Sequence, residues 1–240
     1  MFKHKMHESV SLKVYLDWFL LAFLGGSVNA GGFLACQRFV THVTGFATLA
    51  GIDLASGELA AAFGMLTVPV FFLAGVMVAA YLTDRRVLEG KRPRYELVMS
   101  MVTFFLFLSV AGGVSDWFGP FGGLQLGKDY SLLAILCLAS GLQNAALTSA
   151  SGATIRTTHL TGLTTDLGIG LVRAAGLAAG DKNRSAMMKM NYLRIGTIVS
   201  FMAGSGVGAY LYLRFGYLGF LLPMAIAAYA AAVARKQSAA

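Results

Sequence analysis

The chain contains only four histidines, and two of them stand in copies of one pentapeptide. The first copy, THVTG, covers residues 41–45, and the second, THLTG, covers residues 158–162. Because self-similarity over a long period indicates a repeated structural unit, we interpret the chain as a duplication. The same offset pairs Thr48 with Thr165, Gly51 with Gly168, Ile52 with Ile169 and Leu54 with Leu171, and a slightly different shift pairs Asn29-Ala30 with Asn144-Ala145.

Each copy has the residue types of a helix that begins inside a membrane. Such a start exposes backbone N–H groups that need partners, and threonine is a favourable N-cap residue. Glycine lets another group approach the backbone closely. Since a helix start carries partial positive charge, free N–H groups that face a cavity would bind an anion. The residues concerned are Thr41, Thr44 and Gly45 in the first copy and Thr158, Thr161 and Gly162 in the second.

Ionisable side chains surround both copies. His42 and His159 stand just before the expected helix starts, and Arg38 and Arg156 precede them by about one turn. Such groups are costly at membrane depth and are therefore functional candidates, and histidine can change charge near neutral pH. Asp166 follows the second copy only, because its repeat position in the first copy is a leucine. The predicted substrate-binding residues are Asn29, Thr41, His42, Thr44, Gly45, Asn144, Arg156, Thr158, His159, Thr161, Gly162 and Asp166.

Each of these residues also has a purely structural interpretation. The threonines and glycines can cap and pack helices, and each histidine can hydrogen-bond a carbonyl of the other repeat. Asn29 and Asn144 can join neighbouring helices. Arg38 and Arg156 can extend along the apolar surface to a membrane interface. The sequence leaves these alternatives open.

The composition excludes an ordinary soluble domain. The 240 residues are 57% hydrophobic and 12% charged, with a mean hydropathy of +0.68. The net charge of +8 resides in short loops between apolar runs, which is typical of the positive-inside rule rather than of nucleic-acid binding. The two cysteines lie in or beside apolar segments without metal-ligand spacing, so we expect no metal and no other cofactor.

Six apolar runs are long enough to cross a hydrocarbon core of about 30 Å. The first run resembles a secretory signal, but it contains one copy of the repeated Asn-Ala pair, so we expect it to remain as a span. Two shorter segments, 44–57 and 161–179, open with the pentapeptides and carry polar residues. The sequence therefore predicts an all-α polytopic membrane protein, a single membrane domain over residues 1–240 with six transmembrane helices and two short re-entrant or broken helices. The six runs cover residues 14–36, 59–82, 95–114, 131–150, 192–213 and 215–233.

The distribution of charge indicates how the chain is oriented. The loop 83–94 is rich in Arg and Lys and is expected to be cytoplasmic, whereas the nearly neutral loop 115–130 is expected outside. If neither short segment crosses, the basic residues near both termini also lie inside, so both termini are predicted to be cytoplasmic. An odd number of crossings then separates the repeat units 14–114 and 131–233, which makes them inverted. Inverted repeats with short, Gly-interrupted segments indicate a secondary transporter or channel.

The pattern as a whole resembles a known family. The sequence NAGGFL in the first span, THVTG shortly after it and THLTG after a mid-chain span are similar to the YoaK-like family of bacterial inner-membrane proteins, whose function is unknown. The resemblance extends over essentially the whole chain. It implies a multi-pass location in the bacterial cytoplasmic membrane and supplies no substrate.

Three classes of function remain, and the leading hypothesis is a secondary transporter or channel for a small solute, an anion or a carboxylate. Its site would lie near the membrane midplane between two facing helix starts. The alternatives are a non-transporting membrane scaffold or assembly protein, and a metal-binding membrane enzyme built on His42, His159 and Asp166. We expect no enzymatic activity. The expected partners are the lipid bilayer and a small-molecule or ion substrate, with no nucleic acid, and a homodimer is left open.

Overall fold

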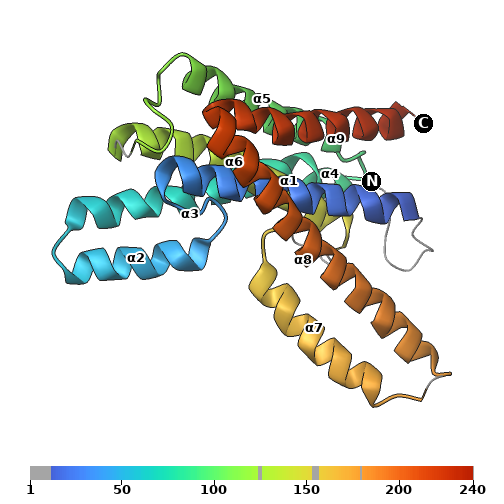
Figure 1. Cartoon of the computed structure of the whole chain (residues 1–240). Helices are drawn as coiled ribbons and strands as arrows, with labels where there is room; N and C mark the ends of the chain where they lie inside the picture. Colours follow the sequence, from blue (N-terminus) through green and yellow to red (C-terminus); the bar gives the residue numbers. More distant parts are fainter. Residues whose placement is uncertain (1–11, 124–125, 153–156, 179, 240) are drawn as a thin grey trace.

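The computed structural model describes residues 12–123, 126–152, 157–178 and 180–239, and its elements are helical (Figure 1). Within this part of the chain, five helical stretches are long and apolar enough to cross a membrane. The fifth, Lys182–Ser238, holds two long helices joined by a short 3-10 helix. The all-helical polytopic fold is confirmed. The elements are α1 (Leu12–Cys36), α2 (Val43–Ala55), α3 (Leu59–Leu82), α4 (Asp84–Leu88), α5 (Tyr95–Val114), α6 (Leu126–Ala150), α7 (Leu160–Ala175), α8 (Lys182–Phe215), η1 (Gly216–Phe220) and α9 (Leu221–Ala239).

The boundaries of α8 differ from the predicted span 192–213. The helix begins at Lys182 because the carboxylate of Asp181 caps it, accepting a hydrogen bond from the N–H of Asn183 at 2.7 Å. It ends at Phe215 because Gly216 has a φ of 54°, a conformation that glycine adopts readily. Its 34 residues extend for about 51 Å, which exceeds the thickness of the hydrocarbon core. The residues before the predicted span, 182–191, are therefore the first part of a long helix.

The two short segments form the helices α2 and α7. They contain 13 and 16 residues and are therefore about 20 and 24 Å long, so neither helix alone spans a core of about 30 Å. Each packs against the long helix that follows it, α2 against α3 and α7 against α8, as two helical hairpins (Figure 1). Both short helices start near the centre of the molecule and run away from it in different directions.

The long helices of the two predicted repeat units are interleaved. α1 packs along α8, α3 packs along α6, and α5 packs against α9. Glycines make these contacts close: Gly204 faces the backbone carbonyl of Phe23, and Gly75 faces that of Leu138. Small residues let helix backbones approach in this way inside a membrane. The beginning of α1, the short helix α4 and the end of α9 lie at one end of the bundle, on the right in Figure 1.

Candidate functional site

The two pentapeptides fold in the same way, and a histidine occupies the N-cap of each short helix. His42 precedes α2 with φ −97° and ψ 68°, and His159 precedes α7 with φ −100° and ψ 56°. The expectation that the motif threonines cap these helices is wrong, since neither start receives a side-chain cap. Because the backbone leaves the helix at the histidine, both flanking threonines are displaced from the capping position. The first N–H groups of α2 and α7 therefore have no cap from their own motif.

The motif glycines make room for the histidine rings. A Cβ placed on Gly45 would lie 2.6 Å from Nδ1 of His42, and one placed on Gly162 would lie 2.6 Å from Nδ1 of His159. Each imidazole thus folds back over the first turn of its own helix. The close approach to the backbone that the sequence predicts is made by the histidine itself.

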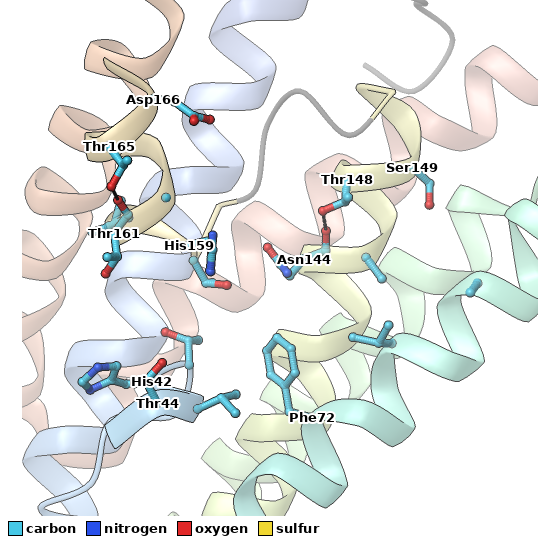
Figure 2. Close-up of a pocket in the computed structure, with 18 of the residues that line it drawn as sticks. His42, Thr44, Phe72, Asn144, Thr148, Ser149, His159, Thr161, Thr165 and Asp166 are labelled. Atoms are coloured by element: carbon cyan, nitrogen blue, oxygen red, sulfur yellow. Dashed lines mark hydrogen bonds between the residues drawn. The ribbon is translucent and has the colours of Figure 1, made fainter. Parts of the chain in front are cut away.

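The starts of α2 and α7 face one cavity of about 830 Å³ (Figure 2). The labelled side chains of Asn144 and His159 lie in the middle of the view, with His42 below them and Asp166 above. The cavity therefore brings together side chains from the two halves of the chain. Of the predicted site residues, those that line it are Thr41, His42, Thr44, Asn144, Thr158, His159, Thr161, Gly162 and Asp166.

The remaining predicted residues lie elsewhere. Oδ1 of Asn29 accepts hydrogen bonds from the backbone N–H and the hydroxyl of Thr41, at 3.2 and 3.1 Å, and Asn29 does not line the cavity. Gly45 supports the ring of His42 from behind, outside the cavity lining. Arg156 lies outside the described residues. Arg38 donates to the backbone carbonyl of Gln37 at 3.0 Å and is also absent from the lining.

Sequence reasoning missed the wall that α3 contributes. Phe72, Val76, Ala80 and Asp84 line the cavity, and their spacing of four residues places them on one face. Phe72 lies near the middle of α3, whereas Asp84 lies just beyond its end, so the cavity runs from the centre of the bundle to one end. This spacing was readable in the sequence, but hydropathy alone does not tell which face of an apolar helix meets a cavity.

Asn144 and the residues that follow it complete the opposite wall. Thr148 and Ser149 lie about one turn beyond Asn144 on α6 and line the same cavity (Figure 2). Oγ of Ser149 donates to the carboxylate of Asp84 at 2.6 Å, which joins the two walls at the outer end of the cavity. Oδ1 of Asn144 accepts from the hydroxyl of Thr157 at 3.2 Å, so its amide nitrogen is left to face the cavity.

The charges of the lining are arranged in two groups. The starts of α2 and α7 supply partial positive charge near the centre, beside His42 and His159. The carboxylates of Asp84 and Asp166 contribute negative charge, and none of the described lining residues is Lys or Arg. Among the described residues, no group of three or more His, Cys, Asp or Glu side chains is placed to hold a metal ion. The arrangement suits a small polar solute better than a resident cation.

Replacing Asn29 with alanine is expected to destabilise the protein by about 1 kcal/mol, because the half-buried backbone N–H and hydroxyl of Thr41 lose their acceptor. Asn29→Asp keeps an acceptor oxygen and should retain more of the stability. Thermal or denaturant unfolding in detergent micelles measures both. Equal losses for the two variants would contradict the assignment of this bond.

The comparisons with known proteins give a family and no closer relative. The chain matches the family model described as "Protein of unknown function (DUF1275)" over residues 18–234. No curated protein and no solved structure matches the chain significantly.

Proposed function

Because the chain belongs to the DUF1275 family of proteins of unknown function, we propose its function from the cavity. The protein is a secondary transporter or channel for a small solute, which binds between the starts of α2 and α7. One observation carries this proposal: two helix starts from different halves of the chain, both without side-chain caps, face one polar cavity in an apolar helical protein. The cavity volume of about 830 Å³ is that of a small-molecule site.

The charges narrow the class of solute. A carboxylate fits the two helix starts, because their N–H groups and His42 and His159 offer donors in a region of positive potential. The path along α3 ends at Asp84, about 18 Å from the level of Phe72 by helix rise, and Asp166 also lines it. Two carboxylates on the approach repel a multiply charged anion. We therefore favour a singly charged carboxylate that also carries hydroxyl or amino groups, for which the threonines and Asn144 provide partners.

The repeat and the membrane orientation form part of the proposal. The same pairing of helices, α1 with α8 and α6 with α3, relates the units 14–114 and 131–233, and α1 and α6 run in opposite directions in Figure 1. This supports inverted units with the site between them. With the basic loop 83–94 inside, the cavity opens to the cytoplasm. The bacterial inner membrane, suggested by the YoaK-like resemblance, is the proposed location, and no enzymatic step is proposed.

Solute-induced stabilisation of the purified protein tests the proposal. Monocarboxylates, amino acids, dicarboxylates, inorganic anions and divalent metals are added singly while thermal unfolding is followed. A solute at about one hundred times its dissociation constant raises the stability by about 2.7 kcal/mol. We expect stabilisation by a monocarboxylate or an amino acid, and uptake of the same compound into proteoliposomes.

Two results would contradict this function. Stabilisation by a stoichiometric divalent metal alone would favour the metal-binding alternative. A solute that binds at the cavity but never accumulates or equilibrates across proteoliposomes, with or without an ion gradient, would favour a sensor or scaffold.

A further inference from the structure

Two helix–helix interfaces, called here the α3–α6 seam and the α1–α8 seam, are related by the repeat. In the α3–α6 seam, Gly75 faces the carbonyl of Leu138 and Gly141 faces that of Phe72, and in the α1–α8 seam two glycines face carbonyls in the same manner. The shift that pairs Asn29 with Asn144 also relates α1 to α6, and a second constant shift relates α3 to α8. In the α1–α8 seam, Gly26 faces the carbonyl of Phe201, and Gly204 faces that of Phe23. The residues that correspond between the two seams are Phe23 and Leu138, Gly26 and Gly141, Phe72 and Phe201, and Gly75 and Gly204.

The two seams differ in the parts of the helices that lie outside these glycine contacts. Residues of α3 and α6 line the cavity, and the hydrogen bond between Ser149 and Asp84 lies at its end. The counterpart of Ser149 is Leu34 on α1, and its carbonyl lies against Gly122 of the loop after α5. On the same helix Gly31 packs against the rings of Tyr212 and Phe220. One seam is therefore open and its counterpart is filled.

An aromatic plug fills the α1–α8 seam, and it consists of Phe121, Tyr212, Tyr217 and Phe220. The ring of Tyr212 is stacked on Phe121 with centroids 6.1 Å apart and contacts Phe220 at 4.7 Å. Phe121 meets Tyr217 edge to face at 5.0 Å. The plug thus joins the end of α8, η1 and the loop after α5 over the far half of α1, at the end of the bundle opposite to the cavity mouth.

Two hydroxyl groups lie buried beside each other beneath the plug. Neither Oγ of Ser27 nor the phenolic oxygen of Tyr212 makes a hydrogen bond of normal geometry within the described part of the chain, so the nearest group that could partner each hydroxyl is the other one, and the two residues are 0% and 1% exposed. Ser27 lies against Gly208, one helical turn from the level where Tyr212 meets Gly31. An unsatisfied buried hydroxyl loses its hydration without compensation, so such groups are rare in proteins. Because these two hydroxyls have at most each other as partners, opening this seam to water would cost less than opening a seam lined only by apolar groups.

We propose that the α1–α8 seam is a second access path to the site, which opens on the opposite side when the plug withdraws and the α3–α6 cavity closes. The proposal rests on the proposed transport function for its purpose. In the open state Ser27 and Tyr212 are hydrated and line the path, and Asn29 lines it as Asn144 lines the cavity now (Figure 2). The described conformation, in which the cavity reaches Asp84 at the start of α4, is one of the two states.

A matched pair of cysteine reporters tests this path. Ala145 lines the cavity, and Ala30 is its counterpart on α1. In a Cys36→Ala/Cys137→Ala background, which removes the two buried native thiols, Ala145→Cys or Ala30→Cys is introduced in the full chain. A membrane-impermeant maleimide is applied to intact cells and to inside-out vesicles. We expect Ala145→Cys to react in the inside-out vesicles and Ala30→Cys to react in the intact cells.

Removing the hydroxyls of Ser27 and Tyr212 should shift the equilibrium away from the state with an open α1–α8 seam and toward the described state. Tyr212→Phe with Ser27→Ala relieves the cost of burying these groups in the described state, while the open seam loses two hydrated groups. The labelling rate of Ala30→Cys should fall about tenfold, which corresponds to about 1.4 kcal/mol. Thermal stability should rise, and the labelling of Ala145→Cys should be retained. Tyr210→Phe on the same helix is the control, because Tyr210 is exposed and its substitution should leave both rates unchanged.

The outcomes separate this inference from the proposed function. If Ala30→Cys never reacts from either side, or reacts at a rate that the hydroxyl substitutions do not alter, the second path does not exist as described. Solute-induced stabilisation that persists in that case would leave the binding site standing. If both reporters react on opposite sides and respond as expected while no solute binds or moves, the path is supported and the transport function fails.

Discussion

Substitution of Gly204 by alanine is expected to destabilise the protein by about 3 kcal/mol or more, the upper part of the range for overpacked sites. The added methyl group would collide with the backbone carbonyl of Phe23 on α1. A backbone group inside a helix cannot rotate away as a side chain can, so α1 and α8 must separate. Their contact is the most extensive between any two helices of the described chain. The free energy of unfolding in detergent or in lipid bicelles measures the loss.

Gly206 provides a matched control on the same helix. A Cβ at Gly206 meets nothing within 4 Å, so Gly206→Ala should leave stability unchanged or raise it by up to about 1 kcal/mol through better helix propensity. Gly75→Ala, the counterpart of Gly204→Ala in the other seam, should cost a similar amount because it meets the carbonyl of Leu138. Equal effects of Gly204→Ala and Gly206→Ala would show that α1 and α8 do not cross closely at this point.

Replacing both motif histidines with alanine is expected to abolish solute-induced stabilisation and transport, whereas the unliganded protein remains folded. His42 and His159 are both exposed to the cavity and flank its two uncapped helix starts, so the double variant removes donors from the centre of the site. Because their rings pack on the first turn of each helix rather than in the core, the cost to folding should be small. Thermal unfolding with and without the solute that stabilises the wild type measures both effects.

Two further variants separate the effect of having the imidazole groups from the effect of where they lie. Gly45→Ala/Gly162→Ala keeps both histidines but forces each ring away from its helix, so it should weaken the response to solute in the same direction. Thr164→Ala changes an exposed residue of α7 outside the cavity lining and should leave the response intact. If the double histidine variant binds and transports the solute as the wild type does, the repeated motif is structural and the site lies elsewhere.

Much of the helical layout follows from the sequence. Residues 59–82 and 95–114 were predicted as apolar runs, and the structure places helices at these positions, because an apolar helix is the arrangement that satisfies its own backbone in lipid. The short segments after each pentapeptide are also helices of roughly the expected extent. The family match agrees with the resemblance at the level of an uncharacterised family.

The sequence also predicts that the two motifs fold alike, because their local residue types match. Identical residue types around His42 and His159 impose nearly the same backbone angles and the same contact between ring and glycine. The sequence did not reveal that the threonines fail to cap the two helices. A threonine favours the N-cap in general, but in both copies the histidine occupies that position.

The sequence alone determined the membrane class and the paired helix starts, since these depend on hydropathy and on repeated local residue types, and it predicts the duplication. The tertiary structure decided that α1 pairs with α8 and α3 with α6, because in an apolar environment close packing at glycines, rather than hydropathy, selects the neighbours of a helix. It also decided that Asn144 faces the cavity while Asn29 holds a loop. Identical residues in the two halves thus have different contacts, because one seam is open and its counterpart is filled.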